Sequence, residues 1–135
     1  MEKYRLLKIK LTPQRLAILD YLNENKSHPS AETIYKAVSK QFPTMSFATV
    51  YNTLETLLNK GSIRELKIEA GKKRYDHDIN PHHHIICIKC NKIVDLYKDY
   101  KIPLPDEITQ EFDLINKNIE FYGTCQNCKK KRNQS

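Results

Sequence analysis

Apolar residues recur at helical spacing in three stretches of the first half of the chain. The first stretch follows Thr12 and Pro13, a start signal because a Thr oxygen accepts a free backbone N–H and Pro has no N–H to leave unpaired. The second follows Ser30 in the same way, and the third runs from Ser46 to Gly61, which favours the left-handed conformation that ends helices. The apolar faces are expected to consist of Leu16, Leu19 and Leu22, then Ile34, Tyr35 and Val38, and finally Phe47, Val50, Tyr51, Leu54, Leu57 and Leu58.

The third predicted helix has a polar face made of Thr49, Asn52, Thr53 and Thr56. Two short strands, residues 62–68 and 73–76, follow it and are joined by a turn with a basic tip, residues 69–72. Three helices and a basic hairpin are the outline of a winged helix-turn-helix, whose last helix enters the major groove of DNA. The alternative is an ordinary amphipathic helix whose threonine-rich side faces water. For DNA binding we expect contacts from Lys10, Thr12, Arg15, Ser46, Ala48, Thr49, Tyr51 and Asn52, with Lys72, Lys73 and Arg74 also on the phosphates.

Composition and charge narrow the class of protein. The 135 residues, 39% apolar and 29% charged, suit one compact domain or two very small ones. No apolar run approaches the roughly 20 residues that span a bilayer, and no leader segment precedes the first helix, so we expect a cytoplasmic protein. Of 23 Lys and Arg, 14 lie at or before Tyr75 with 7 of the 16 Asp and Glu, whereas the rest of the chain has 9 of each. This basic half indicates either a polyanion-binding module or a solvated face.

All four cysteines fall into two CxxC pairs, Cys87 with Cys90 and Cys125 with Cys128. Two such pairs predict one tetrahedral zinc site of four thiolates, closed to substrate and therefore structural. With 34 residues between the pairs, the site would tie a C-terminal strand to an earlier hairpin. The alternatives are disulfides, which a reducing cytoplasm disfavours, and a redox-active pair, for which one CxxC would suffice.

Four of the five histidines lie within residues 77–84, and the fifth is His28, in the break between the first two predicted helices. If residues 83–88 form a strand, His82 and His84 point to one face and His83 to the other. Imidazoles together with the carboxylates of Asp76, Asp78 and Asp95 suit iron(II), manganese(II) or zinc(II). The alternative is a solvated polar loop with adventitious metal affinity, and the spacing alone leaves both open.

Over nearly its whole length the sequence resembles the ferric uptake regulator family. The matching segments, in order, are residues 11–15 (LTPQR), 46–51 (SFATVY), 74–76 (RYD), 82–87 (HHHIIC) with Cys90, and 122–125 (YGTC) with Cys128. The resemblance implies an α+β fold: an N-terminal winged helix-turn-helix, residues 1–76, and a small C-terminal α/β dimerisation domain, residues 77–135, with the four-cysteine zinc site and a hinge near residues 74–82. It also implies a homodimer that represses transcription by binding a palindromic operator.

Within that family the chain is most similar to the peroxide-sensing branch, because Asp95 and Asn52 stand where iron-responsive members usually have Glu and Arg. That similarity implies five regulatory ligands for iron(II) or manganese(II), namely His28, Asp76, His82, His84 and Asp95. A metal held by all five would fix the relative orientation of the two domains, so that metal binding becomes operator affinity. It also implies that peroxide oxidises His28 or His82 at bound iron and so releases the operator. Because no histidine follows His84, a further metal site with a C-terminal histidine is expected to be absent.

Three other functions are alternatives to this one. A metal-responsive uptake regulator of the same family would lack peroxide sensing. A hydrolytic metalloenzyme would need an open metal position with a nucleophile and its base, and no such set is recognised, so we expect no enzyme. An RNA-binding zinc-ribbon protein would carry basic and aromatic residues around the cysteines, but the second half has no net positive charge. The basic run at residues 129–132 is interpreted as a solvated terminus.

Overall fold

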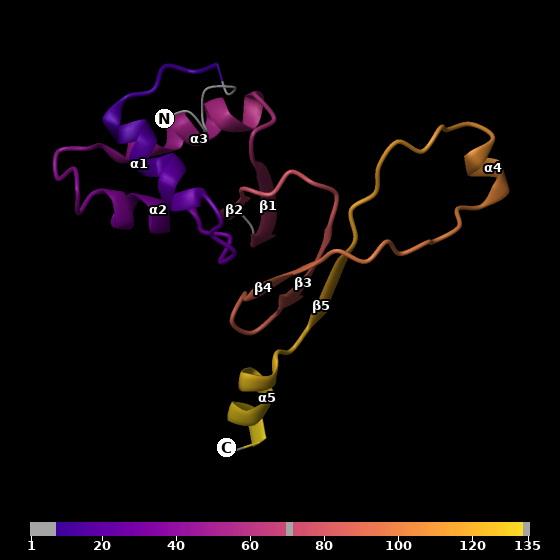
Figure 1. The fold of residues 1–135 in the computed structure, drawn as a ribbon. Coiled ribbons are helices and arrows are strands. Elements are labelled where there is room, and N and C mark those ends of the chain that lie inside the picture. Colours follow the sequence, from indigo (N-terminus) through magenta and orange to yellow (C-terminus); the bar gives the residue numbers. More distant parts are fainter. Residues whose placement is uncertain (1–7, 70–71, 134–135) are drawn as a thin grey trace. The chain divides into compact units, whose positions relative to one another are not determined.

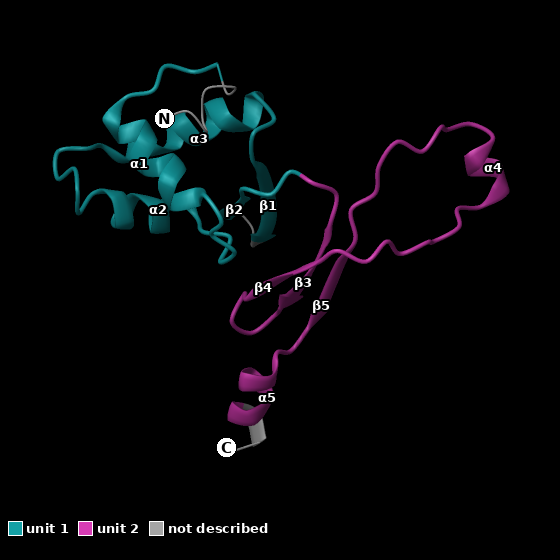
Figure 2. Cartoon of the chain, viewed as in Figure 1, with its two compact units in different colours: residues 1–79 teal, residues 80–135 magenta. Residues whose placement is uncertain are grey.

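The computed structural model describes residues 8–69 and 72–133 of the chain. It divides into two compact units, residues 1–79 and 80–135 (Figure 2). The boundary falls inside the predicted hinge near residues 74–82, three residues beyond the predicted end of the first domain at residue 76. The first unit has three helices and a hairpin, and the second is built around a three-stranded sheet (Figure 1). The predicted α+β fold class is confirmed.

The first unit contains helices α1 (Pro13–Leu22), α2 (Ala31–Val38) and α3 (Phe47–Asn59), followed by strands β1 (Arg64–Glu69) and β2 (Lys72–Asp76). Each helix begins at its predicted cap, because the hydroxyls of Thr12, Ser30 and Ser46 accept the backbone N–H three positions further on. Each such cap typically contributes about 1 kcal/mol. Just after α3, Gly61 has a φ of 70°, as predicted. The order of elements is that of a winged helix-turn-helix.

One hydrophobic core holds the three helices against the hairpin. Ile18, Ile34, Val50, Leu54 and Leu57 are fully buried in it. They come from all three helices and recur at spacings of three and four within α3, so each helix presents one apolar stripe to the others. The core also includes Leu19, Leu22, Ala31, Val38, Met45, Ile63 and, from β2, Tyr75.

Two parts of the predicted pattern of α3 are wrong. Phe47 and Tyr51 were expected on the apolar face, but each ring is 39% exposed. Thr53 was expected on the polar face, but it is buried and its hydroxyl donates to the carbonyl of Thr49 at 2.8 Å. This internal hydrogen bond makes the burial of Thr53 tolerable, because a buried hydroxyl without a partner costs about 1 to 3 kcal/mol.

β1 and β2 form an antiparallel hairpin in which Leu66 lies opposite Arg74 and Arg64 lies opposite Asp76. The strands start within two residues of their predicted positions. The centre of the predicted basic turn, residues 70–71, lies outside the described residues. Because β2 also contacts α2, the hairpin is anchored to the helices, and its last residue, Asp76, reaches the loop before α2.

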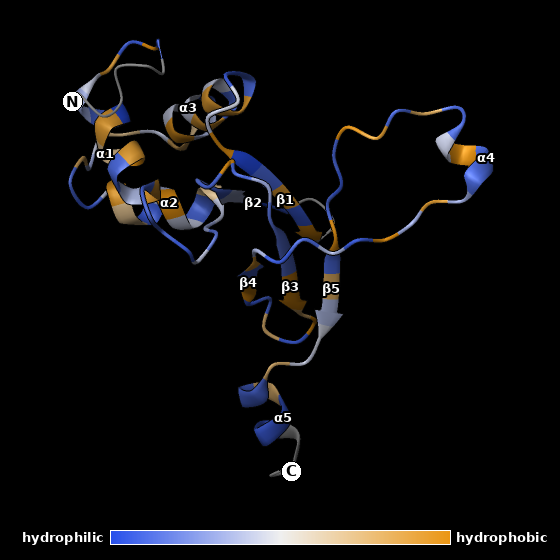
Figure 3. Ribbon diagram, turned by 45° about the vertical axis from the view of Figure 1, so that its right-hand side comes forward, coloured by the Kyte–Doolittle hydropathy of each residue, from blue (hydrophilic) through white to orange (hydrophobic). Residues whose placement is uncertain are grey.

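The second unit contains β3 (His83–Cys87), β4 (Ile93–Leu96), the short helix α4 (Asp106–Thr109), β5 (Glu120–Gly123) and α5 (Gln126–Asn133). The sheet has the order β4-β3-β5, with β3 antiparallel to β4 and parallel to β5. A long segment carrying α4 joins β4 to β5, and Figure 3 shows hydrophobic and hydrophilic stretches along it. α5 is strongly hydrophilic, with Lys129, Lys130 and Lys131 exposed. Within the described ranges, none of the helices combines the length and apolar character that crossing a bilayer requires.

The buried phenol of Tyr75 offers a test of the core of the first unit. Burial, followed by the charge of Glu55, raises the pKa of Tyr75 to about 12. Because the phenol of an unfolded chain ionises near pH 10, the stability that Tyr75 contributes is complete below pH 10 and is lost as the pH rises to 12. Between these values we expect the free energy of unfolding to fall more steeply for the wild-type chain than for Tyr75→Phe, by up to about 1.4 kcal/mol per pH unit. Urea titrations at several pH values measure it, and parallel curves for the two chains would contradict the burial.

Candidate metal centres

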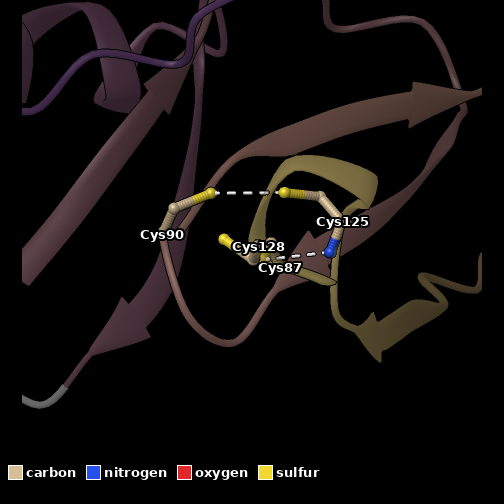
Figure 4. A group of neighbouring side chains, drawn as sticks. All are labelled: Cys87, Cys90, Cys125 and Cys128. Atoms are coloured by element: carbon tan, nitrogen blue, oxygen red, sulfur yellow. Dashed lines mark hydrogen bonds between the residues drawn. The ribbon is translucent and has the colours of Figure 1, made fainter. Parts of the chain in front are cut away.

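The four cysteines converge from two distant parts of the second unit (Figure 4). Cys87 ends β3 and Cys90 lies in the following turn, whereas Cys125 and Cys128 flank the start of α5. All four Sγ atoms lie within 4.8 Å of one another, and the Cys87–Cys128 and Cys90–Cys125 pairs are each 3.8 Å apart. Four thiolates at about 2.3 Å from a tetrahedral zinc stand about 3.8 Å from each other. The predicted ligand set is therefore brought together with the spacing of a zinc site, and the thiols are free rather than joined in disulfides.

The backbone around the cysteines prepares one thiolate. The N–H of Cys125 donates to Sγ of Cys87 at 3.3 Å, and this hydrogen bond is the main reason that the pKa of Cys87 falls to about 6. The N–H of Cys128 lowers the pKa of Cys125, whereas the hydrogen bond with Cys125 raises the pKa of Cys128 to about 12. At neutral pH the Cys128 thiol therefore keeps its proton, which a bound cation must displace.

A second set of ligand groups begins in the first unit with His28 and Asp76. His28 Nε2 lies 3.4 Å from Asp76 Oδ2, and both side chains are almost completely buried. The other Asp76 oxygen, Oδ1, accepts the backbone N–H of Asp78 at 2.9 Å, which orients the carboxylate. His28 has a φ of 53°, a left-handed conformation that costs a residue other than glycine about 1 kcal/mol or more. The surrounding structure must therefore hold His28 in place.

Arg74 provides that hold. Its Nε donates to the backbone carbonyl of His28 and its Nη2 to that of Ser27, the latter at 2.7 Å. The backbone N–H of Tyr75 donates to the Pro29 carbonyl at 2.9 Å. The Arg74 guanidinium therefore binds carbonyls of its own chain, and its phosphate contact stays a prediction. Lys73, also predicted on phosphates, lies 3.3 Å from the carboxylate of Glu65.

In the second unit, His82, His84 and Asp95 form a buried cluster. The Nε2 atoms of His82 and His84 lie 3.4 Å and 3.3 Å from the same oxygen of Asp95. The antiparallel register sets His84 directly opposite Asp95. His82 Nδ1 lies 2.6 Å from the carbonyl of Asn80, and because a carbonyl oxygen only accepts, Nδ1 is the donor in this contact. An imidazole oriented by a backbone carbonyl in this way is typical of a metal ligand.

The donor groups of each unit, taken separately, have the spacing of ligands to a cation of borderline hardness. Ligand atoms about 2.1 Å from one cation stand about 3.0 to 3.5 Å apart, which includes the three separations just given. Imidazoles and carboxylates without sulfur suit iron(II), manganese(II) or zinc(II). His83 is not part of the cluster, because its Nδ1 accepts the N–H of Ile119 at 3.1 Å. The burial of His82 and His84 also argues against the solvated loop.

The predicted DNA-binding residues lie at the surface of the first unit. Ser46, Ala48, Tyr51 and Asn52 are exposed on or just before α3, and Thr49 is half-buried. Near the start of α1, Arg15 donates to the carbonyl of Lys10 at 2.9 Å. Thr12 is the cap of α1. Their contact with DNA stays a prediction.

The fold and these sites define a winged-helix protein joined to a small metal-binding α/β unit. The model of the ferric uptake regulator family matches residues 7–122. The chain is 40% identical over 131 residues to the peroxide-responsive repressor PerR of Staphylococcus epidermidis, covering 93% of this chain and 85% of the relative. It is 41% identical over 131 residues to the peroxide operon regulator of Bacillus subtilis, covering 93% and 88%.

Among solved structures, the ferric uptake regulator of Francisella tularensis with iron has a TM-score of 0.74 at 27% identity, covering 90% of this chain and 96% of that one. The chain belongs to the ferric uptake regulator family, as its motifs predict.

Zinc removal tests the four-cysteine site. We expect one tightly bound zinc per chain, and we expect its chelation to unfold the second unit, because binding at such sites supplies on the order of 10 kcal/mol of folding free energy. Cys128→Ser should have the same effect. The matched control is Ile88→Ser, since Ile88 lies inside the first CxxC pair but is 60% exposed; it should keep its zinc. Hydrogen exchange of residues 80–133 measures the result, and full protection after zinc loss would contradict the assignment.

Proposed function

We propose that this protein is a metal-dependent, peroxide-responsive transcriptional repressor that binds palindromic operator DNA as a homodimer. The observation that carries the proposal is the buried cluster of His82, His84 and Asp95 in the second unit, with the His28–Asp76 pair in the first. Family membership supports it, as do two relatives whose names are peroxide-responsive repressor and peroxide operon regulator. These are names of regulators and not of enzymes.

One iron(II) or manganese(II) ion binds all five predicted ligands in this proposal. His28 and Asp76 belong to the first unit, whereas His82, His84 and Asp95 belong to the second. A cation that needs ligands from both units selects one relative orientation of the units. In a homodimer, that orientation sets the spacing of the two α3 helices against half-sites one helical turn apart. Metal occupancy therefore controls operator affinity.

Bonds between the cation and its protein ligands can supply the preference for the DNA-binding form that this mechanism requires. Shifting a population from 1:99 to 99:1 in favour of the DNA-binding form requires a cation that prefers this form by about 10⁴-fold, or about 5.5 kcal/mol. A form that lacks ligands from one unit loses several metal bonds at once. The buried and oriented donors of each unit support this, because little reorganisation is needed before the cation binds.

The basic first unit supplies the DNA interface of the proposal. Of the chain's 23 Lys and Arg, 14 precede residue 76 against 7 of the 16 acidic residues, a surplus that attracts the phosphate backbone. Asn52, exposed on α3, suits adenine, because its amide pairs with both N6 and N7 in the major groove. Lys10 and Arg15 near the start of α1 would contact phosphates.

Iron(II), when bound, supplies the peroxide chemistry, since it reduces peroxide to an oxidant beside the ligand imidazoles. The chain's contribution is to hold His28 and His82 in fixed positions, the first through its Arg74-bound loop and the second through Asn80. An imidazole that has gained an oxygen atom binds metal poorly, so the two units separate and the operator is released. The cysteines, shielded by zinc, stay reduced under mild exposure.

Manganese titration tests the regulatory site. Adding Mn²⁺ should tighten binding of the protein to a duplex operator steeply, and salt should weaken that binding. Asp95→Asn removes one carboxylate ligand and should raise the Mn²⁺ concentration at half-maximal binding by at least about tenfold. Asp99→Asn is the matched control, because Asp99 is exposed and its Oδ1 pairs with Lys117. Fluorescence anisotropy measures both, and identical titrations for the two variants would contradict the assignment.

Mass spectrometry tests the peroxide response. After peroxide treatment of the iron-loaded protein, we expect a gain of 16 mass units, that of one oxygen atom, in a peptide that contains His28 or His82. His83 is the internal control, since it follows His82 directly but accepts a backbone N–H instead of joining the cluster. Manganese-loaded protein should stay unmodified. If His28 and His82 both stay unmodified, the better function is the metal-responsive regulator without peroxide sensing.

A further inference from the structure

We propose that Phe47 is a specificity residue that packs against the 5-methyl group of a thymine in the operator. This inference rests on the proposed DNA-binding function. Phe47 is the first residue of α3, and the N-terminal residues of a recognition helix are those that contact base edges. It adds an apolar contact to the polar ones expected from Asn52 and Thr49.

The exposure of Phe47 separates it from the core of the first unit. The ring is 39% exposed, whereas Val50, Leu54 and Leu57 of the same helix are fully buried. Tyr51, one turn further along, is also 39% exposed. Two neighbouring aromatic residues of α3 are therefore partly exposed instead of joining the core.

The position of the Phe47 ring is set by two aromatic neighbours. Tyr35 of α2 meets it edge to face, with ring centroids 5.7 Å apart and planes at 84°. The ring centroid of Tyr51 lies 6.5 Å from that of Phe47, with the planes at 30°. Because the ring already packs on these neighbours, binding a partner costs Phe47 less side-chain entropy than it would cost a mobile side chain.

The surroundings of Phe47 favour DNA as the partner. Phe47 and Tyr51 line a hollow of about 160 Å³ whose other walls include Glu32 of α2 and Lys72 and Lys73 of β2. Because Lys73 pairs with Glu65 and Glu55, the attraction for a polyanion comes from the first half of the chain as a whole, which carries all of the net positive charge. A phenyl ring has no hydrogen-bonding group, so among the base edges of the major groove it suits the thymine methyl group.

Replacement of thymine by deoxyuridine tests this contact, because the change removes only the 5-methyl group. The probe is a duplex selected from a random pool by the manganese-loaded wild-type protein, with each thymine replaced in turn. At one thymine of each half-site we expect binding to weaken about fourfold, the effect of removing one methyl group from an apolar contact. Phe47→Ala should bind the duplex with thymine at that position and the duplex with deoxyuridine there equally well. At the other positions, any loss of binding caused by deoxyuridine should be the same as for the wild-type protein.

Two further variants separate this contact from a general loss of structure. Phe47→Leu keeps an apolar side chain and should keep part of the discrimination. Phe112→Ala removes a phenyl group that is 64% exposed in the second unit and should keep the full thymine-to-uridine ratio. We expect Phe47→Ala to fold, since Ala is a strong helix former. A melting curve that matches the wild-type curve would confirm it.

The outcomes distinguish this inference from the function on which it rests. If Phe47→Ala keeps every uridine effect of the wild-type protein, or if the wild-type protein shows none, then Phe47 does not contact a thymine methyl group, although manganese-dependent binding still supports the repressor. If the wild-type protein selects no duplex in a manganese-dependent way, the repressor proposal and this inference both fail.

Discussion

The convergence of four cysteine sulfurs takes the place of a hydrophobic core in the second unit. Among its described residues, the buried apolar side chains are Ile86, Cys87 and Ile93, which cannot offset the conformational entropy of ordering some fifty residues. A zinc ion at these four sulfurs would join two segments that are distant in sequence and would hold β5 beside β3. The proposed zinc would in this way support the sheet whose register sets His84 opposite Asp95.

Each half of the proposed regulatory ligand set is held in place within its own unit. In the first unit, Arg74 holds the loop in which His28 takes its unfavourable backbone conformation. In the second, the Asn80 carbonyl orients the imidazole of His82, and a pair of strands sets His84. Interactions within each unit therefore meet the cost of orienting the donors. In the proposed function, the free energy of binding the cation would then be available to select the relative orientation of the units.

The surface of α3 shows how one helix serves both stability and recognition. Its buried stripe holds α3 to α1 and α2, and the hydrogen bond of Thr53 to Thr49 lets a polar residue join that stripe. The aromatic rings at its start lie outside the core, and the core gains little from them. Their exposure is explained if they contact DNA, since the chain gives up some buried apolar area for an apolar contact in the major groove.

Features that depend on near neighbours in the chain, or on residue type alone, were predictable. A helix cap acts on a backbone N–H three residues away, so Thr12, Ser30 and Ser46 predicted three helix starts. The four cysteines are the only cysteines of the sequence, so a four-thiolate site could be predicted from them alone. Features that depend on distant segments were not. The partners of Arg74 lie 46 and 47 residues earlier in the chain, and the hydrogen-bond donor to His83 is the backbone of Ile119, 36 residues later. The same holds for Phe47 and Thr53, because helical spacing gives the direction of a side chain, whereas the packing of other helices decides whether that direction is buried.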